Sequence, residues 1–228
     1  MLYDGWVLRF SKGYTKRANS VNPLSVSSIK VDEKIRVCED LYAAQGLPSI
    51  FRITPFASPS NLDRVLARRS YIKVDPTLVM HRSLRQNDLP DPAGLREEQP
   101  DDWIGLFCRL TGSPVEQHAT HQEILCAIPS KRILASLDVS GQRVACGVGV
   151  LESNYFGLFD LVTDPQQRNK GYGTTLVSSL LRWGQDHGAA YAYLQVVEKN
   201  TPARHLYTKL GFCHSYGYWY RVPNIARQ

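Results

Sequence analysis

The chain has 228 residues, 43% of them hydrophobic, and a net charge of +6 at pH 7. This length allows one large domain or two small ones with a sizeable core. No apolar run approaches the roughly 20 residues of a membrane helix, and no signal peptide is evident, so we expect a cytoplasmic protein without a membrane partner. The modest positive charge favours a polyanionic ligand, but no nucleic-acid motif accompanies it and no nucleic-acid partner is expected.

The cysteines are odd in number and scattered, which indicates buried thiols in a reducing compartment rather than a disulfide framework. They are Cys38, Cys108, Cys126, Cys146 and Cys213. No C-x-x-C pair suggests zinc. His118 and His121 are placed three residues apart on a predicted helix, but further ligands at suitable spacing are missing, so no metal site is expected.

The N-terminal part alternates short strands and helices. The segment Gly13–Val21 is polar and aromatic and lies between two short strand-like runs. It could line an acceptor pocket made by both halves of the chain, or it could be a hairpin edge. An amphipathic helix follows over 32–44 and a strand over 49–53. A helix through Leu62 and Leu66 then precedes an aromatic-led strand that begins at Tyr71.

The middle of the chain starts with a segment rich in Asn, Asp, Pro and Glu, residues 83–102, which is typical of a linker. Two helices are predicted over 103–110 and 115–128. Three strands are predicted next, over 132–139, 143–151 and 155–163, with a hairpin turn at Ser140–Gln142.

A short loop with two glycines then opens an amphipathic helix over 174–187. The strand ends at Thr163, Asp164-Pro165 breaks it, and the loop reads Arg168-Asn169-Lys170-Gly171-Tyr172-Gly173. A helix N-terminus presents backbone N–H groups and a positive dipole end, and glycines let an anion approach, so this loop is a candidate phosphate site. The alternative is an ordinary surface turn. The pattern is neither a P-loop nor a dinucleotide fingerprint, which needs a third glycine.

The segment after this helix makes the pattern specific. A strand over 193–197 leads to Asn200 and then to a helix. The helix carries Ala203, Leu206, Tyr207 and Leu210 at helical spacing, and Gly211 ends it. A strand over 212–222 follows. The chain here resembles the GNAT superfamily of N-acetyltransferases, because it carries R-x-x-G-x-G followed by N-x-x-A-x-x-L-Y-x-x-L-G-F. The resemblance covers roughly residues 132–222 and implies a mixed sheet flanked by helices.

The resemblance also implies roles for particular residues, with acetyl-CoA as co-substrate. The loop Arg168 to Gly173 (Arg168, Asn169, Lys170, Gly171, Tyr172, Gly173) would wrap the diphosphate. The backbone of Leu161, Val162 and Thr163 would pair with the pantetheine arm, and Asn200 would bind the cofactor. Tyr207 would protonate the leaving thiolate as general acid. The plainer alternatives are a core strand for Leu161 and Val162, a helix-entry turn for Asn200, and a packing aromatic for Tyr207.

The general base is not evident. Some GNAT members carry a Glu five residues before the Asn, whereas this chain has Gln195, which cannot accept a proton as a base. Asp160 and Glu198 are candidates. A chain of waters, or an amine that arrives neutral, would also serve.

The chain looks like two related halves. Ala203 and Leu62, Tyr207 and Leu66, and Phe212 and Tyr71 share one offset of 141 residues (203 − 62, 207 − 66, 212 − 71). At that offset Lys30 stands opposite Gly171 and Leu66 opposite Tyr207. We therefore predict two GNAT-like mixed α/β halves in tandem: a degenerate half over 1–82, the linker 83–102, and a catalytic domain over 103–228.

The predicted function is an acetyl-CoA-dependent N-acetyltransferase that transfers acetyl to a primary amine of a small molecule or peptide by direct attack. A cysteine intermediate is disfavoured because no cysteine lies beside a recognisable base. The alternative is a module that senses acyl-CoA without transferring the acyl group; Tyr207 argues against it and the missing base argues for it.

Overall fold

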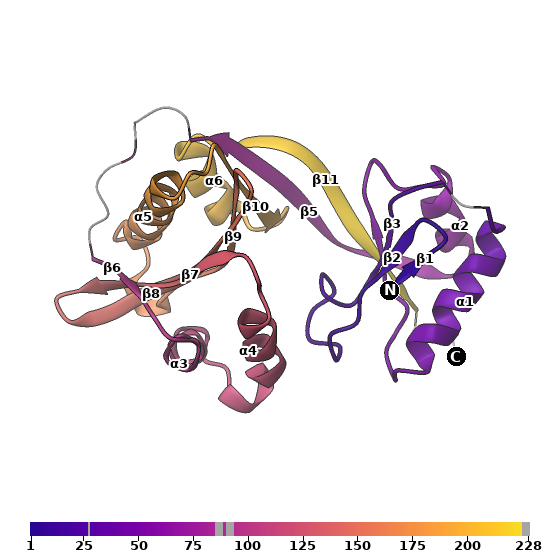
Figure 1. The fold of residues 1–228 in the computed structure, drawn as a ribbon, viewed down its shortest axis with the longest axis horizontal. Helices are drawn as coiled ribbons and strands as arrows, with labels where there is room; N and C mark the ends of the chain where they lie inside the picture. Colours follow the sequence, from indigo (N-terminus) through magenta and orange to yellow (C-terminus); the bar gives the residue numbers. More distant parts are fainter. Residues whose placement is uncertain (27, 85–88, 90–93, 225–228) are drawn as a thin grey trace. The chain divides into compact units, whose positions relative to one another are not determined.

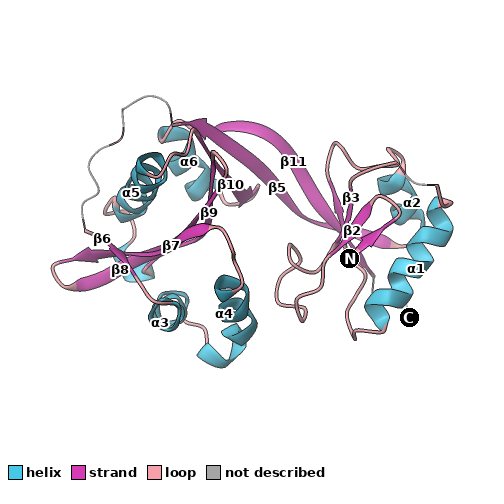
Figure 2. Ribbon diagram, in the orientation of Figure 1, coloured by secondary structure: helices cyan, strands magenta, loops and turns pink. Residues whose placement is uncertain are grey.

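The computed structural model describes residues 1–26, 28–84, 89 and 94–224, which form two compact units (Figures 1 and 2). Unit 1 comprises Met1–Leu78, Val197–Lys199 and the C-terminal segment from Tyr216. Unit 2 comprises Val79–Val196 and Asn200–Ser215. Two long strands, β5 (Tyr71–Ser83) and β11 (Cys213–Pro223), contribute residues to both units.

The sheet of unit 2 has the strand order β5-β10-β9-β8-β7-β6. Its further strands are β6 (Leu95–Glu97), β7 (Lys131–Val139), β8 (Gln142–Glu152), β9 (Tyr155–Thr163) and β10 (Tyr191–Val197). Neighbours from β6 to β9 are antiparallel, and β10 is parallel to β9. The mixed sheet arises because the chain crosses over through a helix between β9 and β10.

Helices cover both faces of this sheet (Figure 1). On one face lie α3 (Pro100–Thr111), η1 (Val115–His118) and α4 (Ala119–Cys126), and on the other lies α5 (Tyr172–Asp186); η2 (Pro165–Gln167) and α6 (Thr201–Lys209) flank α5 in sequence. Trp103 is fully buried, and its indole N–H donates to the carbonyls of Ala135 and Gly147 at 3.1 and 3.2 Å. A Cβ at Gly184 would lie 2.6 Å from the ring of Phe156, so this glycine lets α5 pack closely on the sheet.

Unit 1 has the strand order β1-β2-β3-β4-β11. Its elements are β1 (Leu2–Tyr3), β2 (Trp6–Leu8), β3 (Val21–Pro23), α1 (Val31–Ala43), β4 (Phe51–Ile53) and α2 (Leu62–Arg68). Strand β3 is parallel to β4, and the Trp219–Arg221 part of β11 is antiparallel to β4. Both helices bury apolar residues in one core, made by Trp6, Leu8, Val21, Ile35, Cys38, Tyr42, Phe51, Ile53, Leu62, Leu66 and Tyr71.

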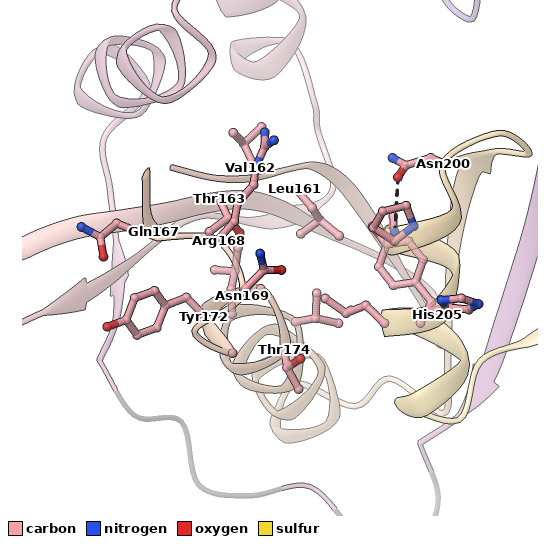
Figure 3. Close-up of a pocket in the computed structure, with 18 of the residues that line it drawn as sticks. Leu161, Val162, Thr163, Gln167, Arg168, Asn169, Tyr172, Thr174, Asn200 and His205 are labelled. Carbon is pink, nitrogen blue, oxygen red and sulfur yellow. Dashed lines mark hydrogen bonds between the residues drawn. The ribbon is translucent and has the colours of Figure 1, made fainter. Parts of the chain in front are cut away.

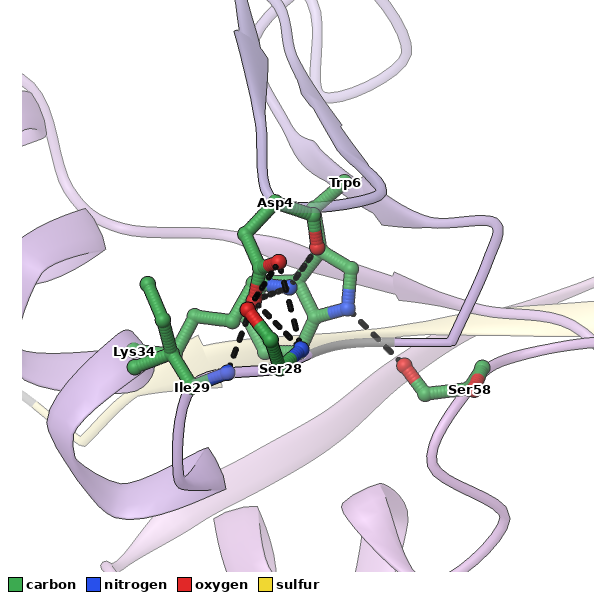
Figure 4. Close-up of polar contacts among 6 residues, drawn as sticks. All are labelled: Asp4, Trp6, Ser28, Ile29, Lys34 and Ser58. Carbon is green, nitrogen blue, oxygen red and sulfur yellow. Dashed lines mark hydrogen bonds and ion pairs between the residues drawn. The ribbon is translucent and has the colours of Figure 1, made fainter.

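A buried lysine lies in this core (Figure 4). Lys34 is fully buried, its ammonium nitrogen lies 4.1 Å from the ring centroid of Trp6, and it forms an ion pair with Asp4 at 3.4 Å. Burial lowers the pKa of Lys34, while Asp4 opposes that shift. Asp4 also accepts from the backbone N–H groups of Ser28 and Ile29, so one carboxylate holds the entry of α1 against β2. The sequence pattern did not predict this burial.

Most predicted elements are present, and a mixed α/β fold with helices flanking the sheet is confirmed. Helix α1 begins 141 residues before α5, and α2 ends 141 residues before α6 (172 − 31, 209 − 68), as the offset between the halves predicts. Strand β6 falls inside the predicted linker, of which residues 85–88 and 90–93 lie outside the described part. The predicted domain boundaries themselves stay a prediction. No helix in the described residues is long and apolar enough to cross a membrane.

The carboxylate of Asp63 on α2 connects this helix to β11. It accepts from Arg221 Nε at 2.7 Å and from a terminal guanidinium nitrogen at 2.8 Å, and the indole N–H of Trp219 donates to it at 2.7 Å. The hydrogen bonds of Arg221 come first among the causes that hold the pKa of Asp63 below its usual value.

We predict that Asp63→Asn lowers the free energy of unfolding by about 2 kcal/mol at neutral pH, because it removes charge-assisted hydrogen bonds. Since the pKa is depressed in the folded state, this stabilisation is present above the unfolded-state pKa of about 4 and is lost as the pH falls through the folded-state pKa. The gap between wild type and variant in urea unfolding should therefore shrink at acid pH. The control is Asp32→Asn, whose exposed carboxylate pairs with Arg69 and should contribute about 0.5 kcal/mol. A gap that persists unchanged to about pH 2.5 would contradict this assignment.

Candidate functional site

A cleft in unit 2, with a volume of about 920 Å³, runs from the end of β9 along the start of α5 to α6. Figure 3 shows Gln167 and Tyr172 toward one end of it and Asn200 and His205 toward the other. Its walls include every predicted site residue except Lys170: Leu161, Val162, Thr163, Arg168, Asn169, Gly171, Tyr172, Gly173, Asn200 and Tyr207. Lys170 is exposed and donates to the side chain of Gln167 at 2.8 Å.

The cleft begins where β9 and β10 part. Their parallel register runs from Tyr155↔Tyr191 to Leu158↔Leu194 and ends there, although β9 continues to Thr163. On its other side β9 stays paired with β8 as far as Thr163. The backbone of residues 161–163 therefore presents to the cleft an edge that, within the described residues, pairs with no strand. Such an edge offers N–H and C=O groups to an extended ligand.

A β-bulge marks the point of separation. Phe159 pairs with Val148 and Val162 with Cys146, so Asp160 and Leu161 together oppose the single residue Gly147. Asp160 has a left-handed backbone, with φ 50°. A Cβ at Gly147 would lie 2.6 Å from the side chain of Leu161, so the glycine leaves the space that Leu161 fills. Bulges bend a strand and increase its twist, which explains why β9 turns away from β10 here.

The loop before α5 presents backbone donors to the cleft. Asp164 starts it by accepting from the N–H of Gln166 at 2.9 Å, and Asn169 has φ 62°. Gly171 is the N-cap of α5 with φ 84°, and no side chain caps the helix. A Cβ at Gly171 would meet nothing within 4 Å, so its backbone conformation, not crowding within the protein, requires glycine. The first N–H groups of a helix have no intrahelical acceptor and carry the positive end of its dipole.

The charges of the cleft fit an anionic ligand. Arg168 and Lys209 line it together with His205, and none of the described lining residues is Asp or Glu. The first turn of α5 contains no acidic residue either. Because the described lining carries positive charge and no carboxylate, it favours an anionic ligand such as a diphosphate.

Tyr207 lies on α6 and is half-buried. Among the described residues none forms a hydrogen bond with its hydroxyl, and burial raises its pKa to about 12. The phenol therefore stays protonated at neutral pH. The ring also lies 6.0 Å from that of Phe212, centroid to centroid, which agrees with the packing alternative as well.

Asn200 is the N-cap of α6 and also lines the cleft. Its carbonyl oxygen accepts from the backbone N–H of Ala203 at 3.3 Å, the contact drawn in Figure 3. The helix-entry role considered for Asn200 is therefore present. It uses the side-chain oxygen, and the amide nitrogen of the same side chain is still a donor for a ligand.

The two candidate bases lie in different places. The carboxylate of Asp160 lies 3.0 Å from Nε2 of His121, a contact between residues 39 positions apart that the sequence did not reveal. Asp160 directly precedes the open edge, and 36% of its side chain is exposed, against 5% for His121. Glu198 belongs to unit 1, and neither of the two carboxylates is among the residues that line this cleft. In the described residues no group of three or more His, Cys, Asp or Glu could hold a metal.

Some residues of the cleft were missed by the sequence analysis. Leu110 and Thr111 line it from the end of α3, and only tertiary packing brings them there. His205 and Lys209 lie four residues apart on one face of α6, two residues before and after Tyr207, so helical spacing from the tyrosine did not predict them.

The chain is similar to several known proteins. The N-acetyltransferase YobR of Bacillus subtilis (strain 168) is 34% identical over 223 residues, which is 95% of this chain and 89% of YobR. A solved GCN5-related N-acetyltransferase from Kribbella flavida superposes with a TM-score of 0.72 at 13% identity, covering 98% of this chain and 88% of the other. A tandem GNAT protein from the clavulanic acid biosynthesis pathway superposes with a TM-score of 0.64 at 13% identity, covering 89% and 74%.

These likenesses confirm the predicted fold class. The family model described as "Probable histone acetyltransferase Rv0428c C-terminal" matches residues 1–221. The chain therefore belongs to that family and is an N-acetyltransferase of the GNAT superfamily.

Proposed function

We propose that this enzyme transfers acetyl from acetyl-CoA to a primary amine, with its chemistry in the cleft of unit 2. The observation that carries the proposal is the single cleft that brings together the open edge of β9, the uncapped start of α5 and the hydroxyl of Tyr207. Acetyl-CoA supplies the acetyl group as a thioester, with a thiolate as leaving group.

The residues present fit acetyl-CoA. The backbone N–H groups at the start of α5, with Arg168, would hold the diphosphate. The backbone edge of Leu161–Thr163 would bind the amides of the pantetheine arm as an added strand. A volume of about 920 Å³ is at the upper end of ordinary ligand pockets, as a large and elongated co-substrate requires.

Tyr207 would act on the sulfur. Burial raises its pKa to about 12, so the phenol carries its proton when the thiolate forms. A protonated phenol can donate to the sulfur while negative charge develops there, which stabilises the transition state. Tyr207 would thus act as the general acid for the leaving thiolate.

Asp160 would accept the proton of the attacking amine. It lies next to the open edge, and His121 is within hydrogen-bond distance of its carboxylate and would orient it. Direct attack of the amine is favoured over a cysteine intermediate because burial raises the pKa of both Cys108 and Cys146, and no cysteine lines the cleft.

The first test concerns the loop. Gly171→Ala forces a side chain into a left-handed backbone and should cost about 1 kcal/mol of stability. It should also weaken CoA binding in calorimetry at least tenfold, since the N–H groups of the loop lose their alignment. Gly188→Ala is the control, because Gly188 has φ 94°, has nothing within 4 Å of a Cβ, and is not among the residues that line the cleft. Equal CoA affinity of the two variants would remove the loop from the site.

The second test separates the enzyme from a sensor. We expect thiol release from acetyl-CoA to depend on an added amine, and Tyr207→Phe to lower kcat about 100-fold while CoA affinity stays within a factor of two. The amine panel includes small primary amines and lysine peptides of histone tails, because the family is described by a probable histone acetyltransferase. If CoA binds but no amine promotes release, the sensor alternative is favoured.

The third test addresses the base. Asp160→Asn should lower kcat about 100-fold and remove a limb of the pH–rate profile, because an amide cannot accept the proton. The fold should survive, since Asn tolerates the left-handed backbone at this position. The matched control is Glu198→Gln, for which wild-type turnover is expected. The opposite result, with only the Glu198 variant impaired, would assign the base to the other carboxylate.

A further inference from the structure

A second cavity, with a volume of about 600 Å³, lies entirely within unit 1. Its walls come from the β2–β3 loop, the turn before β4, and strands β5 and β11, with the last residue of β10 and one residue that follows it. They are Gly13, Tyr14, Thr15, Lys16, Arg17, Asn19, Leu47, Pro48, Ile50, Asp75, Thr77, Val197, Lys199, Tyr218 and Tyr220. The segment Gly13–Val21, for which the sequence left two readings open, therefore contributes to a cavity wall.

One buried side chain fixes the loop that forms this wall. Asn19 is 3% exposed; its carbonyl oxygen accepts from the N–H groups of Ser11 and Gly13 at 2.6 and 3.0 Å, and its amide donates to the carbonyl of Thr15 at 2.8 Å. An asparagine that satisfies both ends of a loop in this way holds the loop in one conformation. The cavity is thus preformed, and a ligand would not have to order the wall when it binds.

The charge of the lining is positive. Lys16, Arg17 and Lys199 line the cavity, against the single carboxylate of Asp75. Asp75 pairs with Lys16 at 3.1 Å and is the one carboxylate in the described lining. Glu198 lines a smaller hollow of about 240 Å³, which shares Asp75, Val197 and Lys199 with this cavity.

The floor of the cavity is aromatic and close to a further guanidinium. Tyr218 and Tyr220 are buried, with ring centroids 5.6 Å apart. The guanidinium carbon of Arg52 lies 3.9 Å from the centroid of Tyr218. Burial raises the pKa of Tyr220, and both Arg17 and Arg52 oppose that shift, so both positive charges act at the phenol. A guanidinium binds a carboxylate or phosphate through paired hydrogen bonds, and an aromatic ring offers a flat surface on which a planar group can pack.

We propose that this cavity binds a small molecule with a carboxylate or phosphate group, held by Arg17 and Lys199 over Tyr218 and Tyr220. The site is separate from the acetyl-transfer chemistry and does not rest on it. Carboxylate and phosphate share the bidentate geometry that a guanidinium recognises.

The test uses three probes with one benzene ring each: phenyl phosphate, benzoate and benzylammonium. Titration calorimetry of the full chain at low salt should show saturable binding of at least one of the two anions and none of benzylammonium. Binding of phenyl phosphate alone would identify a phosphate ligand, and binding of benzoate alone a carboxylate ligand. Either result supports an anion site.

Variants locate the site. Arg17→Gln should weaken anion binding between about tenfold and a hundredfold, as expected for a lost charge-assisted hydrogen bond. Lys199→Gln, at an exposed residue where the fold is not at risk, should weaken it at least threefold. Arg36→Gln, on the exposed face of α1, removes the same charge outside the cavity and should leave binding unchanged. Arg168→Gln alters the cleft of unit 2 and reports any anion that binds there instead.

The proposal would be overturned if neither anion showed saturable binding, or if benzylammonium bound as tightly as the anions. It would also be overturned if the Arg36 variant lost as much anion affinity as the Arg17 variant, or if the Arg17 and Lys199 variants both kept wild-type anion affinity. Loss of binding in the Arg168 variant alone would place the anion in the cleft of unit 2. Acetyl transfer can succeed or fail independently of these titrations, so the two proposals are tested separately.

Discussion

The functional features of unit 2 depend on the parting of two parallel strands. If β9 and β10 stayed paired beyond Leu158 and Leu194, the backbone of Leu161–Thr163 would be used up within the sheet. A bulge at Asp160 and the absence of a side chain at Gly147 turn β9 away from its neighbour while its other edge remains paired. The sheet is therefore intact on one side of β9 and open on the other. A backbone edge open in this way is costly unless water or a ligand satisfies it, which is why such edges are usually found at binding sites.

In unit 1, the strand that corresponds to β9 does not part from its neighbour. At the offset of 141 residues, Val21 corresponds to Val162, which lies at the open edge of unit 2 (162 − 21). Val21 is in register with Phe51 on the neighbouring strand, and its N–H donates to the carbonyl of Ile50 at 2.7 Å. The strand of unit 1 that corresponds to the end of β9 is thus still paired on the side where β9 is open. Lys30, not a glycine, precedes α1. These contacts support the prediction that the first half lacks the site for acetyl-CoA.

The sequence was a good guide to elements and to the cleft wherever the signal was local. Helix starts, the glycine at the α5 N-cap and the helical spacing around Tyr207 are set by neighbours in the chain, so motifs predicted them. Contacts between distant residues left no such trace. The burial of Lys34 depends on Trp6 and Asp4, about 30 residues away, and strand β6 is defined by its pairing with β7 rather than by its own composition. The two long strands that serve both units were predicted as strands, but their division between units depends on packing alone.

The proposed base is a residue that spacing from the motif does not predict. The position five residues before Asn200 holds Gln195, which predicts no base on β10. A carboxylate is nevertheless present one strand away, at the residue where β9 bends, with a buried imidazole 3.0 Å from it. Both the open edge and the placement of Asp160 result from the same bulge, because a residue with φ 50° cannot continue a regular strand. The feature that lets a thioester arm enter would then also place the group that deprotonates the amine. A substitution that restored a regular strand at Asp160 would remove both functions together.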